Sequence, residues 1–186
     1  MSKRKTPVNK ENPLGWAELP RPSNYFDVWK TMLKNNIETL RSYGATSFDD
    51  LKQWDARVIL DAALWKIPEF NLKYRGQYYS RGVWERSLKE GRLPTPNTGI
   101  WTKNSRSECI FEHVVERRPL INWLMENPQR CDHIENVVVA CIVLPQEEKK
   151  LPKNMPVDPT NVWARYKEAK IDVWDRKNNE WLLKFN

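Results

Sequence analysis

The chain has 186 residues, enough for one folded domain or for one domain with a small appendage. Its formal net charge is +7 and its pI is about 9.3, a balance that favours nucleic acid as a partner ahead of an anionic membrane surface. No apolar run is long enough to cross a bilayer, and the basic N-terminus lacks the apolar segment of a signal peptide. We therefore expect a cytoplasmic protein with no membrane partner.

Three cysteines, Cys109, Cys131 and Cys141, form no CxxC pair. This pattern is typical of a reducing compartment and predicts three buried thiols. The alternative is a zinc site that combines them with His113 or His133, although the spacing matches no standard zinc-binding pattern.

Residues 1–22 contain five basic residues and four prolines among few apolar groups. This composition predicts an extended basic arm, which either follows a phosphate backbone or is solvated. Residues 23–186 are expected to form a single α+β domain. Its parts are a helical part at 23–90, a candidate catalytic core at 108–150, and a C-terminal helix and hairpin at 159–186.

Two amphipathic segments follow the arm. Apolar residues recur at every third or fourth position from Phe26 to Leu40, and Gly44 ends this pattern. A second helical pattern begins at Ser47 and includes Trp65. Because the turn between the two is short, we expect them to pack as a helical hairpin.

Basic and aromatic residues are interleaved between Leu72 and Arg86. Guanidinium groups pair with phosphates and aromatic rings stack on bases, so this mixture predicts a nucleic-acid surface. Its candidate contacts are Lys73, Arg75, Tyr78, Tyr79 and Arg81. Ser80 is expected to cap a short helix that reaches Glu90 and stops at Gly91, which would place a helix N-terminus near a bound anion. In the alternative, the tyrosines pack inward and the arginines only face water.

The stretch from Glu108 to Lys150 carries the strongest indications of chemistry. Glu112 and His113 lie side by side on a strand predicted at residues 109–115. A histidine is suited to act as a general base because its ordinary pKa lies near neutrality. A neighbouring carboxylate can orient it or bind a divalent metal. Adjacent residues on a regular strand point to opposite faces, so only one of the two would face a given substrate.

Arg117 and Arg118 follow closely, and they are suited to hold a phosphodiester or to stabilise charge on it. A second apolar run at residues 137–144 predicts a buried strand. Two carboxylates, Glu147 and Glu148, come directly after this strand. Together with Glu112 of the first predicted strand, they are the candidate metal ligands.

The order of Glu112 and His113, a helical spacer, Asn136 and a closing polar group resembles the core of the HNH, or His-Me finger, nucleases. The resemblance covers residues 108–150. It implies that His113 activates water, that Glu112 helps to bind the metal, and that Asn136 orients the histidine or braces the loop. It also implies a divalent metal ion, with magnesium as the first expectation.

The chain departs from that family at the last ligand, where Glu147 and Glu148 are the nearest candidates. The glycine-rich loop and the paired CxxC motifs of the family are missing as well. A different nuclease template, the PD-(D/E)xK core, is an alternative, because Glu147-Glu148-Lys149 follows a predicted strand.

Residues 159–170 predict a helix with Trp163 inward and Arg165 outward. Residues 171–174 and 181–185 flank a polar turn and predict a β-hairpin with aromatic residues paired across it. The expected fold is therefore α+β, with an N-terminal helical hairpin packed on a small mixed or antiparallel sheet and a C-terminal β-hairpin.

These patterns favour a nucleic-acid-processing protein, in first place a metal-dependent endonuclease of bacterial or phage origin that hydrolyses phosphodiester bonds. DNA is favoured over RNA as the substrate. One alternative is a nucleic-acid-binding protein without catalysis, in which His113 is structural. Another is a basic protein that binds an acidic protein partner.

Overall fold

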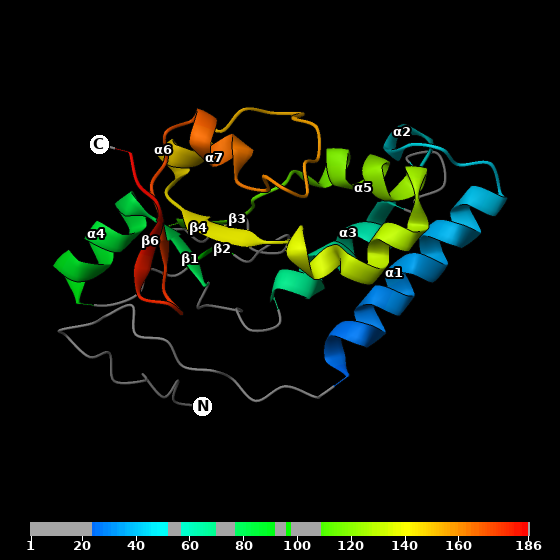
Figure 1. Cartoon of the computed structure of the whole chain (residues 1–186), viewed down its shortest axis with the longest axis horizontal. Coiled ribbons are helices and arrows are strands. Elements are labelled where there is room, and N and C mark those ends of the chain that lie inside the picture. The colour runs from blue at the N-terminus through cyan, green and yellow to red at the C-terminus, as the bar shows by residue number, and fades with distance from the viewer. Residues whose placement is uncertain (1–23, 52–56, 70–76, 92–95, 98–108, 186) are drawn as a thin grey trace.

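The computed structural model describes residues 24–51, 57–69, 77–91, 96–97 and 109–185, and these residues form an α+β structure (Figure 1). The basic arm at residues 1–22 lies outside the described residues, as do Lys73 and Arg75. The predicted fold class is confirmed.

Six strands of the described residues form one mixed sheet in the order β2-β3-β4-β1-β5-β6. Their bounds are β1 Tyr78–Ser80, β2 Pro96–Asn97, β3 Cys109–His113, β4 Ala140–Val143, β5 Val173–Asp175 and β6 Glu180–Leu183. Strand β2 runs parallel to β3, and β4 runs parallel to β1, while the other neighbours are antiparallel.

The helical segments are α1 Tyr25–Ser42, α2 Phe48–Leu51, α3 Arg57–Glu69, α4 Arg81–Glu90, α5 Arg117–Glu126, the 3₁₀ segment η2 Pro128–Asn136, α6 Pro145–Glu148 and α7 Ala164–Glu168. Helices α1, α2, α3 and α5 gather at one end of the molecule, while α4, α6 and α7 lie with the strands at the other end (Figure 1). The predicted N-terminal hairpin is present as α1 packed against α3. Together with α5 and η2 these helices enclose one apolar core, which includes Leu33, Ile37, Leu60 and Leu64.

Each face of the sheet has its own core because side chains alternate along every strand. On one face, Tyr79, Phe111 and Ile142 pack with Val83 of α4. On the other face, Cys141 and Val143 pack with residues of α7 and of the segment before it, including Leu151 and Tyr166. All four residues of β4 are buried, as expected for a strand covered on both faces.

Residues 78–80 form a strand at the centre of the sheet, whereas the composition placed them in the helical part. Strand β1 is only three residues long, and it pairs with β4 on one side and with β5 on the other. Three residues are too few to show the alternating pattern of a strand in the sequence. Pairing with β4 and β5 stabilises β1 instead. The predicted helix after it is confirmed: the Ser80 hydroxyl accepts a hydrogen bond from the Val83 N–H, and Gly91 ends α4 with a φ of 62°.

The C-terminal hairpin is also confirmed, with Trp174 opposite Trp181 and their rings 5.2 Å apart. The preceding helix α7 is shorter than expected, because the segment before it contains a turn in which Asp158 accepts hydrogen bonds from Thr160. All three cysteines are free and buried, as predicted. Burial raises the pKa of Cys131 to about 12.

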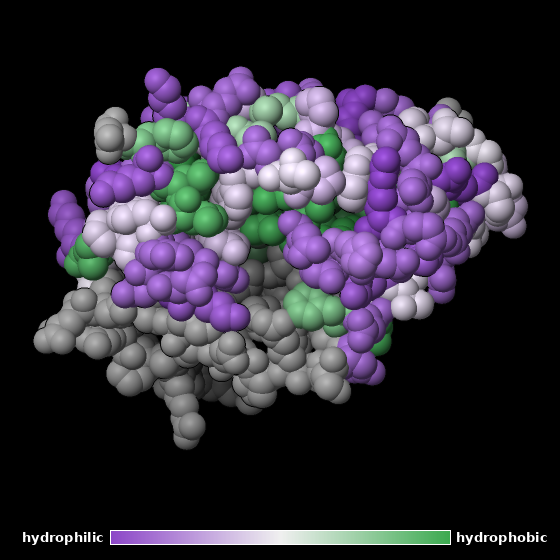
Figure 2. All heavy atoms as spheres, in the orientation of Figure 1, coloured by the Kyte–Doolittle hydropathy of each residue, from purple (hydrophilic) through white to green (hydrophobic). Residues whose placement is uncertain are grey.

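Hydrophilic side chains dominate the face of the molecule that Figure 2 shows, with hydrophobic residues in small patches between them. Among the described residues, no helix is both long enough and apolar enough to cross a membrane.

Candidate functional site

Strand β3 sends Glu112 and His113 to opposite faces of the sheet. In the register with β4, Glu112 lies opposite Cys141 and His113 lies opposite Ala140. The Glu112 carboxylate reaches Arg165 of α7, while the His113 ring contacts Trp65 of α3. The two side chains therefore cannot act on one atom from the same side, as the alternation of a regular strand predicts.

Glu112 forms a buried ion pair. One carboxylate oxygen lies 3.2 Å from the Arg165 Nη1, and the Arg165 side chain is only 5% exposed. Burial raises the pKa of Glu112, even though the nearby guanidinium acts in the opposite direction. This corrects the expectation that Arg165 faces outward: it also donates to the carbonyl oxygens of Pro152 and His113, at 2.8 and 2.9 Å.

His113 is buried, with 5% of its surface exposed. Its ring centroid lies 4.4 Å from that of Trp65, in an edge-on arrangement. Burial lowers the pKa of His113 to about 3, and the positive charges of Arg117 and Arg165 add to the effect. The imidazole is therefore neutral at physiological pH. Within the described part of the chain, neither ring nitrogen has a hydrogen-bond partner.

A pocket of about 350 Å³ opens beside His113, and we call it the arginine pocket. Its lining comes from two distant parts of the chain, α2 and α3 on one side and β3 and α5 on the other. The residues are Phe48, Arg57, Asp61, Trp65, Glu112, His113, Glu116, Arg117 and Arg118. Four predicted site residues, Glu112, His113, Arg117 and Arg118, thus line a single pocket.

The guanidinium groups of this pocket lie on aromatic rings. Arg117 is 5.5 Å from the ring centroid of Trp65, and Arg118 is 5.8 Å from that of Phe48. Arg57 also lies over Phe48, at 5.9 Å. Ring faces carry negative charge, so these contacts stabilise and orient the cations.

Carboxylates partner the same arginines. The Asp61 carboxylate is 3.2 Å from Arg117 and 3.8 Å from Arg57, and Asp49 pairs with Arg118. Burial raises the pKa of Asp61, while the two arginines counteract this effect. The pocket is therefore a mixed electrostatic site, in which paired charges surround a neutral histidine.

The two carboxylates after β4 have different surroundings. Glu147 is a structural acceptor: its oxygens take hydrogen bonds from the Leu144 N–H at 2.9 Å, from the Gly82 N–H at 3.1 Å, and from the Ser80 hydroxyl. Glu148 lies near enough to Glu112 for its charge to raise the pKa of that residue. Of the two carboxylates after β4, Glu148 is therefore the one that acts on Glu112.

Asn136 is exposed at the end of η2, and no hydrogen bond joins it to either nitrogen of His113. Among the described residues, no group of three or more His, Cys, Asp or Glu side chains is placed to hold a metal ion. A magnesium site and the HNH core therefore stay predictions.

Tyr78, Tyr79 and Arg81 lie on β1 and α4, away from the lining of the arginine pocket. Tyr79 is fully buried, so its ring belongs to the core and offers no surface to a base. Tyr78 is half-buried against Trp163, and its pKa is raised to about 12, chiefly by burial. Arg81 pairs with Asp172 and lies over the ring of Trp181.

Sequence reasoning missed the contribution of α3. Arg57, Asp61 and Trp65 are spaced by four residues, so they lie on one face of that helix, and all three line the arginine pocket. The spacing of a cation, an anion and an aromatic residue by four positions indicates that one face of α3 belongs to a polar site. The sequence alone did not show that this face meets the end of β3.

The chain matches no protein-family model, and no curated protein or solved structure shows significant similarity to it.

Proposed function

We propose that this protein binds nucleic acid and that the arginine pocket holds part of the phosphate backbone. The observation that carries the proposal is the convergence of Arg57, Arg117 and Arg118 on one pocket beside a neutral histidine. The formal charge of +7 supports it, because a basic protein attracts polyanions over its whole surface.

The ion pairs of these arginines leave some of their N–H donors available to a ligand. A guanidinium has five N–H donors in a planar fork, and it often binds phosphate through two of them. Arg117 and Arg118 remain partly exposed, at 37% and 49% of their side-chain surface. Each has donors for a phosphate oxygen while it keeps its carboxylate partner.

His113 supports a binding role in a second way. A buried polar group without a hydrogen-bond partner costs roughly 1–3 kcal/mol, and a ligand that supplies the partner removes this cost. Both nitrogens of the neutral ring meet this description. A neutral imidazole offers one donor and one acceptor, but both nitrogens are buried, so the ring has to turn towards the pocket before a phosphate oxygen or a sugar hydroxyl can bond to one of them.

Binding of labelled DNA and RNA, measured by fluorescence anisotropy over a range of salt concentrations, tests the proposal. We expect affinity to fall with salt, and Arg117→Gln and Arg118→Gln each to lower the salt slope by about 1. Lys89→Gln on α4 is the control, because it removes one positive charge from an exposed residue that lies outside the pocket and outside the predicted surface at residues 72–86.

Thermal melts of each variant separate loss of binding from loss of folding. The proposal fails if the folded protein binds neither nucleic acid. It also fails if the control variant weakens binding as much as the two pocket variants do.

A metal-dependent endonuclease is the second candidate. The observation that favours it is the shared lining of the arginine pocket by Glu112, His113 and the two arginines of α5. The neutral ring has a pKa of about 3, which makes His113 a weak base, so this candidate has less support than binding alone.

Incubation of DNA and RNA substrates with Mg²⁺, with Mn²⁺ and with a chelator decides between the two candidates. For an endonuclease we expect cleavage that is lost both in the chelator and in His113→Ala. Binding without cleavage under every condition would favour the non-catalytic protein.

A further inference from the structure

A second pocket, of about 570 Å³, adjoins the arginine pocket and shares Arg118 with it. We call it the Trp123 pocket. Helix α5 lines one wall, which includes Arg118, Asn122, Trp123 and Glu126, and the segment before α7 lines the other wall, which includes Asn154 and Val157. Its volume is in the range of sites that hold small organic ligands.

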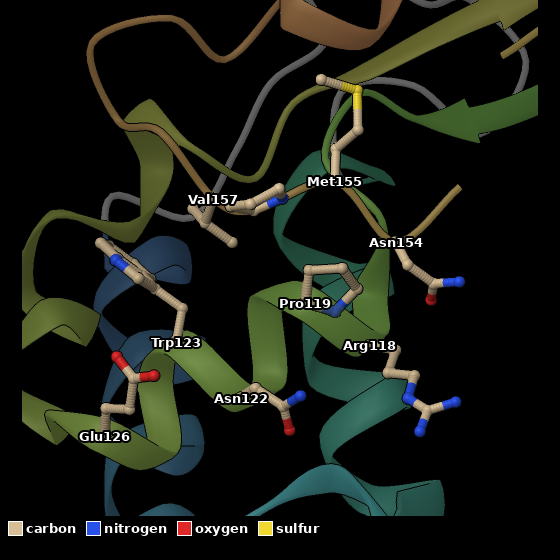
Figure 3. A pocket seen from close by; sticks show the side chains of 9 residues that line it. Arg118, Pro119, Asn122, Trp123, Glu126, Asn154, Met155 and Val157 are labelled. Carbon is tan, nitrogen blue, oxygen red and sulfur yellow. The ribbon is translucent and has the colours of Figure 1, made fainter. Parts of the chain in front are cut away.

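The two ends of this pocket differ in chemistry. Figure 3 shows Trp123 and Val157 on one side of Pro119, and Arg118 and Asn154 on the other. One end therefore carries the flat ring of Trp123, with the Glu126 carboxylate beside it in an ion pair with Arg130, and the other end carries a cation and an amide. A nucleotide has the same division, with a flat base at one end and an anionic phosphate at the other.

Trp123 is held in place by its neighbours. The Arg130 guanidinium lies 4.7 Å from its ring centroid, and the Arg130 Nη1 donates to its carbonyl oxygen at 2.6 Å. An aromatic side chain that is already ordered loses little conformational entropy when a base packs against it. Aromatic contacts of this kind strengthen binding roughly 5- to 100-fold per base.

Asn122 adds hydrogen-bonding capacity of defined direction. Its Oδ1 accepts from the Phe48 N–H at 2.7 Å, so its Nδ2 is the group that it can offer to a ligand. The opposite wall is also anchored, because the Asn154 N–H donates to the Glu116 carboxylate and Arg165 holds the Pro152 carbonyl. Both walls of the pocket are thus formed before a ligand binds.

We infer that the Trp123 pocket takes one unpaired base of a single-stranded nucleic acid, whose phosphates extend past Arg118 into the arginine pocket. This rests on the proposed function and adds the substrate class to it. A base inside the pocket is not available for Watson–Crick pairing, so a duplex would have to lose a base pair to fill it.

Fluorescence anisotropy tests the inference with three labelled ligands, namely an intact single strand, the same strand with abasic positions and the matching duplex, and with an unlabelled mononucleotide as competitor. We expect the abasic strand and the duplex to bind roughly 5- to 100-fold more weakly than the intact strand. The mononucleotide should displace the strand only in large excess, because it makes fewer phosphate contacts. A mononucleotide that binds as tightly as the strand would assign the pocket to free nucleotides and overturn the inference.

Asn154→Gly is the most selective variant. Asn154 has a φ of 58°, a conformation that glycine adopts without strain, and the backbone N–H that bonds Glu116 is kept. Asn179→Gly, at the same φ of 58° in the β5–β6 turn, is the matched control. Because Asn154 lies at the end assigned to the phosphates, we expect only Asn154→Gly to weaken binding, and to weaken it by the same factor for intact and abasic strands.

Two results separate this inference from the proposed function. If intact strand, abasic strand and duplex bind equally well, the base pocket is excluded while nucleic-acid binding stands. If none of them binds, the proposed function fails and the inference fails with it.

Discussion

Arg165 and Glu112 join the C-terminal helix α7 to the end of strand β3 through a buried ion pair with an N–O distance of 3.2 Å. The same guanidinium reaches Glu116 at 3.8 Å, next to the start of α5. It also donates to backbone carbonyl oxygens on either side of this junction. Arg165 therefore connects α7 and the segment before it to the end of β3 and to the residues that lead into α5.

Arg165→Met is expected to lower the free energy of unfolding by about 3–5 kcal/mol, because it leaves the buried Glu112 without its cation. Chemical denaturation at neutral pH measures the change. Lys167→Met on the same helix is the control, since Lys167 is exposed and its loss should have little effect.

A double-mutant cycle with Glu112→Gln identifies the partner. Glu112→Gln should be much less harmful in the Arg165→Met background than in the wild type, because the charge it removes no longer has a partner. Strictly additive effects would show that the ion pair does not account for the loss.

His113 is expected to make stability depend on pH. Its folded pKa of about 3 lies below its ordinary value of 6.5, so the unfolded chain binds a proton that the folded chain excludes. The contribution of His113 is therefore fully present above pH 6.5. Below pH 6.5 this contribution to the free energy of unfolding decreases by about 1.4 kcal/mol for each pH unit, until the pH reaches the folded pKa of about 3.

Comparison of His113→Phe with the wild type between pH 8 and pH 5 checks this. Phenylalanine keeps an aromatic ring against Trp65 but cannot bind a proton, so the difference in unfolding free energy between the two proteins should shift in favour of the variant at lower pH. The exposed His133 provides the control. A His133→Phe variant that changes the pH profile as strongly would contradict the assignment to His113.

Gly82→Ala is expected to destabilise the protein by about 1–3 kcal/mol, although alanine normally stabilises a helix relative to glycine. A Cβ at position 82 would lie 2.7 Å from the Leu144 Cδ1 and 2.8 Å from the Glu147 Oε1. Glu147 cannot move aside freely, because hydrogen bonds to Ser80, Gly82 and Leu144 hold its carboxylate.

Thermal unfolding of Gly82→Ala, Glu147→Ala and the double variant tests this account. Glu147→Ala should itself cost about 1–3 kcal/mol, since it leaves the donors at Ser80, Gly82 and Leu144 without their acceptor. The double variant should lose less than the sum of the two changes. A Gly82→Ala protein more stable than the wild type would exclude the close packing.

Asp175→Ala is expected to loosen the C-terminal hairpin at a cost of about 1–3 kcal/mol. The buried carboxylate accepts from the backbone N–H groups of Lys177 and Asn178, at 2.9 and 3.2 Å, and so holds the β5–β6 turn. Hydrogen exchange of the β5–β6 amides measures the loosening. Asp158→Ala is the control, because its similar turn is exposed and should contribute less.

Local sequence patterns determined much of the secondary structure. The apolar spacing in α1, the Ser80 cap and Gly91 stop of α4, and the aromatic pair Trp174 and Trp181 all depend on residues close in the chain. Their physics is local, so the sequence carries it. The alternation of β3 also showed in advance that Glu112 and His113 face opposite ways.

Only the tertiary structure decided which partners these residues meet. Strand β1 exists because β4 and β5 pair with it, and Arg165 turns inward because two carboxylates and three carbonyl oxygens surround it. The pKa of His113 likewise depends on burial beneath α3, a helix far away in the sequence. Burial, ion pairing and strand pairing arise from contacts between distant segments, and no local pattern encodes them.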